Sequence, residues 1–340
     1  MPVSAAAPPR ALDAAYRGRR VLVTGGLGFI GSHVARRLLR LGAAVTVIDA
    51  LVPGFGGHPF NVEDVRDELR ILTRDLREPG AAEEAVQGQD YVFHLAGQVS
   101  HTESMSDPQR DLAHNAGATL ALLEACRRAS PSARVVFAGT RQVYGRPQRR
   151  PVDETHPCAP LDVNGVHKWA AEQYHRLYHD VHGVASVVLR LTNTYGPGQL
   201  VKHSRQGFIG WFVRKAVEGS EIEIMGDGTQ RRDLNYVDDV VDAMTLAAAS
   251  PQAFGRVYNL GSGEPVSLEA LARLLIEVAG RGSLRFVPFP PERKSIDVGS
   301  VEIDDARIRK ELGWAPRVGL REGLERTVRY YERHLARYLA

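Results

Sequence analysis

The sequence predicts an α/β protein built on a doubly wound parallel sheet, followed by a smaller C-terminal α/β subdomain. Short apolar runs of strand type are expected at 21–23, 43–48, 69–72, 91–95, 134–138 and 185–191. Amphipathic helical patterns lie between them, with apolar residues recurring every three or four positions over 111–128 and 165–179. Strands that alternate with helices are typical of a parallel sheet covered on both faces.

The regular alternation ends near Leu191. Glycine, proline and charged residues punctuate the chain up to residue 232, and another mixed segment runs from 262 to a helix expected over 320–334. We expect residues 19–190 and about 233–260 to form the sheet domain, and about 191–232 and 261–340 to form the subdomain. Residues 1–18 are rich in alanine and proline without a continuous apolar run, so a disordered tail is expected there.

Composition narrows the classes of function. The chain has 340 residues, and its 44% hydrophobic content can build a large core. Lys plus Arg is 43 against 40 Asp plus Glu, so nothing favours nucleic acid or an anionic membrane as partner. The only cysteines, Cys126 and Cys158, have no metal-ligand spacing and predict neither a disulfide nor a metal site. No long uncharged apolar run occurs, and a cytoplasmic location is expected.

The most specific motif is a strand that runs into three glycines, Gly25, Gly28 and Gly31. Glycine allows a sharp turn and lets backbone amides approach phosphate oxygens, while the following helix directs its positive end at them. A second apolar strand ends in Asp49, whose carboxylate can accept hydrogen bonds from an adenosine ribose and repel a 2′-phosphate. An ordinary glycine-rich turn would lack this combination. The motif therefore predicts a Rossmann-type sheet that binds NAD in preference to NADP.

Further motifs follow in a fixed order along the chain. They are Asp75-Leu76, the HLAGQ segment at 94–98, Asn115 with Gly117, GTRQVYG at 139–145, RLTNTYGP at 190–197, residues 226–233, and LGWAP at 312–316. Over about 19–335 this order resembles the extended short-chain dehydrogenase/reductase family, specifically its nucleotide-sugar epimerases and dehydratases. The resemblance implies that NAD is held by Gly25, Gly28, Phe29, Ile30, Gly31, Asp49, Asp75, Leu76, Leu95, Ala96, Gln98, Asn115 and Lys168.

The resemblance also implies a chemistry. Family members move a hydride between a sugar carbon and nicotinamide while a hydroxyl proton is removed, so that a ketone forms transiently. A Ser or Thr contacts the reacting oxygen, and a Tyr beside a Lys moves the proton. Thr140 matches the first position and Lys168 the Lys, but the Tyr position is Asn164. A carboxamide has no usable proton at neutral pH, so Asn164 can orient a hydroxyl but cannot be its base.

Three explanations of Asn164 remain open. The chain is a silent homologue that binds the cofactor, an enzyme in which another group moves the proton, or a variant made to trap a complex. If another group moves the proton, the candidates are His101, His167 and Glu103. Imidazole titrates near neutrality and suits the task, although a lone histidine is more often structural. The unusual neighbours at 141–142 and 167 favour a natural branch over an engineered change.

The reaction type follows from the same segment. In the 4,6-dehydratases an acidic pair or a Glu follows the Ser/Thr, and the decarboxylases also place a Glu there, whereas this chain has Arg141 and Gln142. Neither residue can supply that acid or base, so a nucleotide-sugar epimerase is favoured, most simply at C4. The alternatives are a 4,6-dehydratase or dehydrogenase and, in another class, a non-catalytic protein that binds NAD or a nucleotide sugar.

The resemblance assigns the partners too. A nucleotide-diphosphate sugar is the expected substrate, with contacts from Gln142, Asn193, Arg232 and Arg293. The guanidinium donors form a fixed fork that matches phosphate oxygens. The helices expected at 111–128 and 165–179 match those that pair across a two-fold axis in this family, which implies a homodimer.

Overall fold

The computed structural model describes residues 9–340, except for the side chains of residues 9–11, 292 and 293. No helix in this part of the chain is long and apolar enough to cross a membrane. The same residues include no group of three or more His, Cys, Asp or Glu side chains placed to hold a metal ion.

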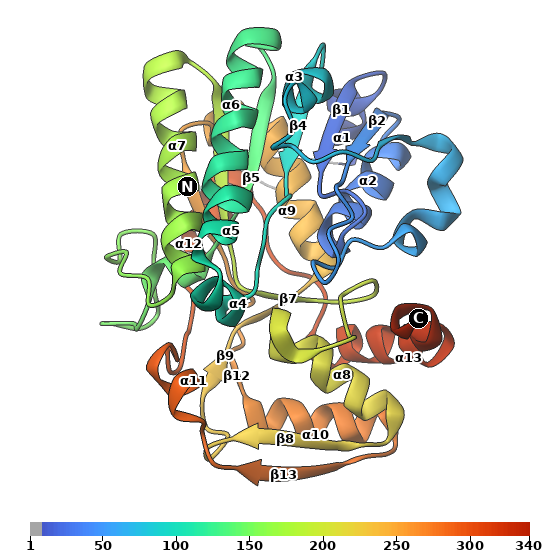
Figure 1. The fold of residues 1–340 in the computed structure, drawn as a ribbon, viewed down its shortest axis with the longest axis vertical. Helices are drawn as coiled ribbons and strands as arrows, with labels where there is room; N and C mark the ends of the chain where they lie inside the picture. Colours follow the sequence, from blue (N-terminus) through green and yellow to red (C-terminus); the bar gives the residue numbers. More distant parts are fainter. Residues whose placement is uncertain (1–8) are drawn as a thin grey trace.

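A seven-stranded sheet forms the larger part of the molecule (Figure 1). Its order is β11-β6-β5-β4-β1-β2-β3, and every neighbouring pair is parallel. The strands are β1 (Arg20–Thr24), β2 (Ala44–Ile48), β3 (Arg70–Leu72), β4 (Tyr91–His94), β5 (Arg134–Thr140), β6 (Ala185–Leu191) and β11 (Val257–Leu260). The strand order reverses beside β1, which is where open parallel sheets bind ligands. The doubly wound sheet and its six expected strands are confirmed.

Helices cover both faces of the sheet. On one face α2 (Phe29–Arg40) packs against α9 (Val237–Ala249), and on the other α6 (Ala118–Ala129) packs against α3 (Ala81–Val86) and α7 (Val163–His182). Alternate residues of β1 belong to different cores, because Val21 and Val23 contribute to the first cluster and Leu22 to the second. Strands buried on both faces read as continuous apolar runs, which is why this sheet was predictable.

The helix expected at 111–128 is interrupted. α4 (His101–Ser106) and α5 (Pro108–Leu112) lead into a π-helical turn, η2 (Ala113–Gly117), and α6 follows directly. The turn buries His114 and Asn115. Such π-turns are frequent at functional sites because they redirect side chains within a helix.

The C-terminal part of the chain lies below the sheet in the view of Figure 1. There β8 (Glu221–Met225) pairs in parallel with β13 (Ser283–Val287), and α8 (Phe208–Glu218), α10 (Leu268–Ala279) and α13 (Leu320–Leu339) pack together. Two further pairs are β7 (Asn193–Tyr195) with β10 (Leu234–Tyr236), and β9 (Arg231–Arg232) with β12 (Val266–Ser267). The remaining helices are α1 (Pro9–Tyr16), α11 (Pro291–Ser295), α12 (Ala306–Leu312) and the 3-10 helices η1 (Pro59–Glu68), η3 (Arg141–Tyr144), η4 (Ser204–Gln206) and η5 (Pro251–Ala253).

The expected disordered tail is wrong for part of its length. Residues 1–8 lie outside the described residues, but residues 9–16 form α1, which packs against α9. Tyr16 is fully buried, and its hydroxyl donates a hydrogen bond of 2.7 Å to the carbonyl of Thr245. The buried Tyr16 side chain therefore fixes α1 against the core, although the composition of this segment did not predict a packed helix.

We expect Tyr16→Ala to lower the free energy of unfolding by about 3 to 5 kcal/mol, because the change empties a large buried site and removes the hydrogen bond to the Thr245 carbonyl. Urea denaturation would measure the loss. Arg17→Ala changes the exposed neighbour and should leave the transition in place. An unchanged midpoint for Tyr16→Ala would contradict the anchoring role.

Candidate active site

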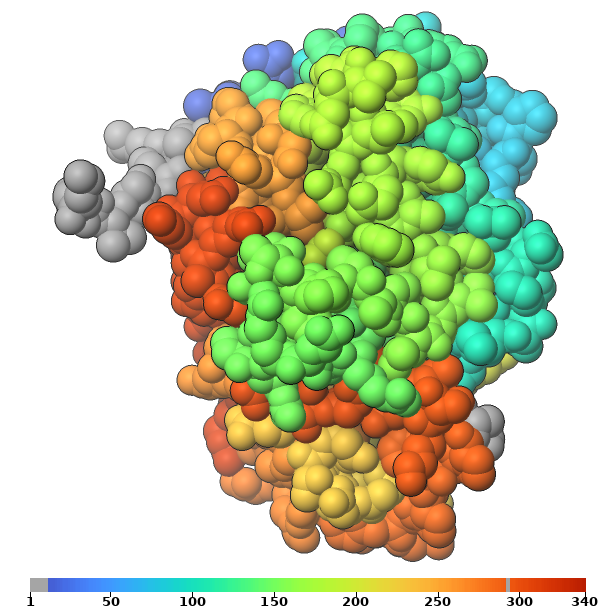
Figure 2. All heavy atoms as spheres, turned by 90° about the vertical axis from the view of Figure 1, so that its left-hand side faces the viewer, coloured from blue at the N-terminus to red at the C-terminus, as the bar shows by residue number. Residues whose placement is uncertain are grey.

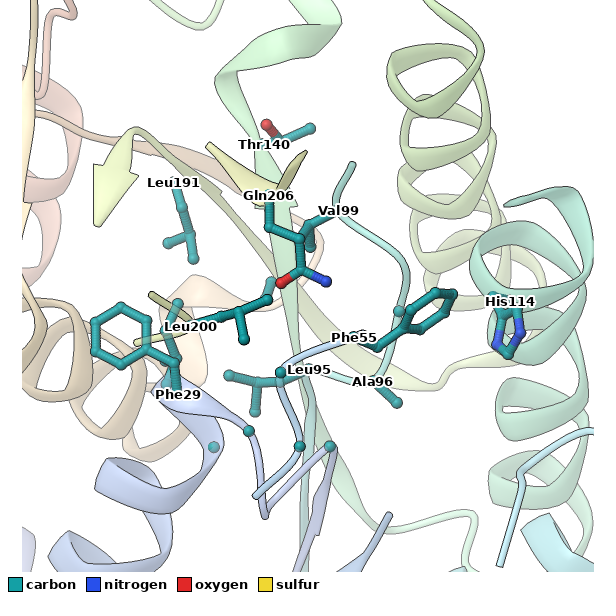
Figure 3. Close-up of a pocket in the computed structure, with 18 of the residues that line it drawn as sticks. Phe29, Phe55, Leu95, Ala96, Val99, His114, Thr140, Leu191, Leu200 and Gln206 are labelled. Atoms are coloured by element: carbon teal, nitrogen blue, oxygen red, sulfur yellow. The ribbon is translucent and has the colours of Figure 1, made fainter. Parts of the chain in front are cut away.

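A cavity of about 350 Å³ lies where strands of the sheet end (Figure 3). It receives the turn after β1, the ends of β2, β5 and β6, the start of α7 and the segment after β7. The cofactor residues expected from sequence that line it are Gly25, Gly28, Phe29, Ile30, Gly31, Asp49, Asp75, Leu76, Leu95, Ala96 and Lys168. Thr140, Asn164, His101, Gln142 and Asn193 line it too.

The glycine turn has the shape needed for close approach by a ligand. Gly25 has φ +66°, and a Cβ at Gly31 would lie 2.2 Å from the Gly25 carbonyl oxygen. The helix α2 begins directly afterwards, and Gly28 supplies no side-chain cap to its first amide groups. These amides are therefore free to bind an anion, so the turn fits a dinucleotide pyrophosphate.

Asp49 lies at the end of β2 on the wall of the same cavity. Its carboxylate accepts hydrogen bonds from the backbone N–H groups of Leu27 (3.0 Å) and Leu51 (2.9 Å). Burial raises the pKa of Asp49 despite these two bonds. A carboxylate has about four acceptor positions, so this group retains capacity for ribose hydroxyls.

A threonine that the sequence did not single out shapes the opposite wall. Thr24 Oγ1 accepts the backbone N–H groups of Leu95 (3.1 Å) and Ala96 (3.0 Å) and lies 2.9 Å from His94 Nδ1. Burial lowers the pKa of His94 to about 3, so the imidazole is neutral. Because Thr24 uses its acceptor positions on the two amides, its hydroxyl donates to Nδ1. This network holds 95–96 against the glycine turn.

The reaction end of the cavity combines Thr140 and Lys168. Thr140 is the last residue of β5, and its Oγ1 accepts the N–H of Gln142 at 3.1 Å. Lys168 Nζ donates to the Ala138 carbonyl at 2.7 Å and lies 4.2 Å from the centre of the Phe137 ring. Burial lowers the pKa of Lys168 to about 8. The two side chains thus bring a hydroxyl and a readily neutralised ammonium to one place.

Asn164 is held in a buried polar network. Its Nδ2 donates to the Gln98 carbonyl (2.8 Å) and to Asp111 Oδ2 (3.0 Å), and Asp111 Oδ1 lies 2.7 Å from His167 Nδ1. Asn115 also donates to the Gln98 carbonyl, at 3.1 Å. Three residues that the sequence places at the site do not line the cavity: Gln98, Asn115 and His167. They lie behind the residues that form its wall.

His101 occupies a different position. It lines the cavity, and its Nδ1 lies 3.0 Å from Asp162 Oδ2. Asp162 is buried, caps α7 through a 2.7 Å bond from the Gly165 N–H, and accepts Gln142 Nε2 at 2.8 Å. Burial alone would raise the pKa of Asp162, but the adjacent His101 and the hydrogen bonds outweigh it and lower that pKa. An imidazole backed by a buried carboxylate can accept a proton from a ligand.

Of the residues expected to bind substrate, some line the cavity and others do not. Asn193 lines the cavity, and among the described residues no group is bonded to its buried Oδ1. Arg232 does not line it; its guanidinium donates to Asp297 Oδ1 (3.2 Å) and to backbone carbonyls, including that of Gly299. The Arg293 side chain lies outside the described residues, although its backbone belongs to α11.

Several lining residues have no signal in the sequence. Figure 3 shows Phe55 beside His114, with ring centres 5.0 Å apart, and shows Val99, Leu200 and Gln206 around the same space. They come from separate loops, from η4 and from the π-turn, so only the folded chain brings them together.

For Asp49→Asn we expect NAD affinity to fall about ten- to a hundredfold and the preference over NADP to disappear, because a charged acceptor for the ribose is lost. Calorimetric titration with both cofactors would measure this. Asp180→Asn, an exposed change on α7, is the matched control. Equal affinity of the unaltered protein for NAD and NADP would contradict the assignment.

Comparison with known proteins places these features in one family. A model described as the NAD dependent epimerase/dehydratase family matches residues 21–261. The UDP-glucose 4-epimerase of Mycolicibacterium smegmatis is 32% identical over 316 residues, which cover 92% of this chain and 98% of that protein. The dTDP-glucose 4,6-dehydratase of Streptomyces griseus is 34% identical over 323 residues, covering 92% and 94%.

A solved structure agrees. The UDP-glucose 4-epimerase of Thermus thermophilus, solved in complex with NAD, is 33% identical, has a TM-score of 0.82, and is matched over 92% of this chain and 98% of its own. The family model, the NAD complexes among structural neighbours and the glycine turn described above agree on the cofactor, which is NAD. The chain belongs to the NAD-dependent epimerase/dehydratase family, of the extended short-chain dehydrogenase/reductase type.

Proposed function

We propose that this chain is an NAD-dependent nucleotide-sugar epimerase, acting most simply at C4 through a transient keto-sugar. The observation that carries the proposal is the single cavity that joins the glycine turn to Thr140 and Lys168. Bound NAD would accept a hydride from the sugar carbon and return it. The protein's residues must then bind the sugar, orient its hydroxyl and move the hydroxyl proton.

Thr140 and Lys168 fit the orienting role. Thr140 Oγ1 already accepts the Gln142 N–H, so its own O–H is available to donate to the reacting oxygen. The Lys168 ammonium would stabilise negative charge that develops on that oxygen. Because its pKa is lowered to about 8, this charge is present at neutral pH and is lost in mildly alkaline solution.

The residues after Thr140 favour epimerisation over loss of water. Gln142 has both ends of its amide engaged, with Nε2 donating to Asp162 (2.8 Å) and Oε1 accepting from Arg141 (3.0 Å). Neither side chain is a carboxylic acid that could protonate a leaving hydroxyl. Removal and return of a hydride on the two faces of the ketone require no such acid.

His101 is the better candidate for moving the proton. It lines the cavity, whereas the other histidine considered, His167, faces Asp111 and does not. In the forward step the sugar O–H bond breaks and the imidazole takes the proton. In the second step the imidazole returns the proton to the oxygen as the hydride returns to the opposite face of the carbon. The carbon then has the opposite configuration.

A second candidate function is supported by Asn164. The Nδ2 group of its carboxamide is occupied by Gln98 and Asp111, as expected for a residue kept for structure. A protein that binds NAD and a nucleotide sugar without turnover would need no base at this position.

A homodimer is also proposed. Val166, Trp169, Leu177 and Val181 lie on one face of α7 and are 36% to 65% exposed, and Leu120 on α6 is similarly exposed. Figure 2 shows α7, in yellow-green, at the surface beside the teal helices. An apolar stripe on two adjacent helices favours a self-complementary interface, because a second copy would bury it.

The first experiment identifies the reaction. We expect purified protein, incubated with UDP-, GDP-, CDP- and dTDP-sugars, to yield an isomer of unchanged mass, detected by mass spectrometry and NMR. Lys168→Met is the inactive control, because it removes the ammonium beside the reacting oxygen. Loss of 18 Da would indicate a dehydratase, loss of two hydrogens a dehydrogenase, and binding without product the non-catalytic alternative, by the mass balance of each reaction (roughly 18 Da for water).

The pH dependence of turnover tests the role of Lys168, and two histidine variants test that of His101. The rate should fall above about pH 8 as the Lys168 ammonium is lost. His101→Gln should reduce turnover by about 10² to 10⁴ and leave NAD affinity intact. His167→Gln is the matched control. If His101→Gln keeps full activity, or if the unaltered protein is silent and Asn164→Tyr activates it, the assignment to histidine is wrong.

We expect a dimer mass by light scattering at micromolar concentration. Changing Leu177 and Val181 together to glutamate should give a folded monomer, since buried charge at a two-fold interface is unpaired on both sides. Phe286→Glu alters an exposed apolar residue on β13 and should leave the dimer intact. A monomeric unaltered protein would reject the proposal.

A further inference from the structure

Arg141 places a positive charge in the active-site cavity that the reaction described above does not use. It follows Thr140 directly and lines the cavity. Its side chain makes one hydrogen bond to the residues that the structure describes, from Nη1 to Gln142 Oε1 at 3.0 Å. Within the described residues no carboxylate oxygen lies close enough to form an ion pair with it, at a limit of 4.0 Å. A cation in a cavity without an anion in the chain is arranged for an anion on a ligand.

The neighbouring carboxylates are already engaged. Asp297 Oδ1 pairs with Arg232 at 3.2 Å, and Asp162 Oδ2 lies beside His101 at 3.0 Å. Asp233 accepts the backbone N–H of Ser262 at 2.6 Å.

Arg141 remains charged in these surroundings. Burial, reinforced by the nearby Arg232, lowers the pKa of Arg141 to about 10. The guanidinium is thus protonated at neutral pH although its environment disfavours the charge. An anionic ligand group would relieve both desolvation and the repulsion from Arg232.

We propose that Arg141 binds a carboxylate on the sugar, and that the substrate is a nucleotide-linked uronic acid. This inference rests on the proposed function and specifies its substrate class. In a hexuronate the carboxylate is attached at C5, next to the reacting C4, while the nucleotide diphosphate is attached at C1 across the ring. Thr140 would contact the C4 oxygen, so the next residue along the chain is placed for the adjacent carboxylate.

The Arg141 side chain is also oriented for this role. Gln142 Oε1 holds one guanidinium nitrogen, and Gln142 is itself fixed by Asp162 at 2.8 Å. The remaining donors of the planar fork can bind both oxygens of a carboxylate. The same chain of contacts reaches His101, so the acidic group and the proton acceptor would be positioned together.

The test compares acidic and neutral sugars on the same nucleotide. Calorimetry on NAD-loaded protein would use UDP-glucuronate against UDP-glucose, GDP-mannuronate against GDP-mannose, and UDP and GDP alone. We expect the acidic member of one pair to bind about ten- to a hundredfold more tightly than the neutral member. Equal affinities within both pairs would overturn the inference and leave the proposed function standing. If none of the four sugars binds, both fall.

Variants assign the effect to the side chain. Arg141→Gln should abolish the preference and leave affinity for the neutral sugar unchanged, while Arg141→Lys should retain part of the preference. Arg149→Gln removes an exposed arginine paired with Asp153 and is the control. If Arg141→Gln weakens the nucleotide alone as much as both sugars, the guanidinium binds the diphosphate and the inference is wrong. The preference of the unaltered protein tests the inference even if a variant fails to fold.

Discussion

The buried carboxylate of Asp162 is the interaction on which the reaction end of the cavity depends. One oxygen caps α7 through the Gly165 N–H, and the other meets both Gln142 and His101. Since α7 carries Asn164 and Lys168, a single group sets the start of that helix and the positions of side chains from two other elements. A buried carboxylate is costly unless its acceptor positions are filled, and here two of the contacts of Asp162 are made by residues that line the cavity, Gln142 and His101.

The departure from the family pattern at Asn164 makes physical sense together with His167. Asp111 is almost fully buried, and its two oxygens contact Asn164 Nδ2 and His167 Nδ1. Each residue therefore contacts one oxygen of the same buried carboxylate. A hydrogen-bonded set of this kind is stable when complete and costly when one member is lost. The contacts explain why two unusual residues occur one turn apart, and they favour a natural branch over a single introduced change.

The sequence predicted what depends on local pattern. Buried parallel strands are continuous apolar runs, and the glycine turn needs small residues at fixed spacing, so six strands and the glycine-turn half of the site were predictable. The seventh strand, β11, was missed because its four residues include Asn259 and no strand-helix alternation marks them. Tyr16 was missed because its partner, Thr245, is 229 residues away. Phe55 reaches the cavity from a loop and Gln206 from the short 3-10 helix η4, where tertiary contacts rather than periodicity decide position.

The sequence could place His101, Gln142 and Arg141 near the site but could not rank them. Their roles follow from which side chains face the cavity and which face one another, and His101 and His167 have equal chemical merit until the fold separates them. The resulting charge arrangement is asymmetric. Asp49 lines the end of the cavity at the glycine turn and β2, whereas Lys168 and Arg141 line the end where Thr140 lies. Burial disfavours the charged form of all three, so each gains from a complementary ligand group: hydroxyl donors at one end, and negative charge at the other. This polarity would orient NAD and the proposed nucleotide sugar in one direction along the cavity.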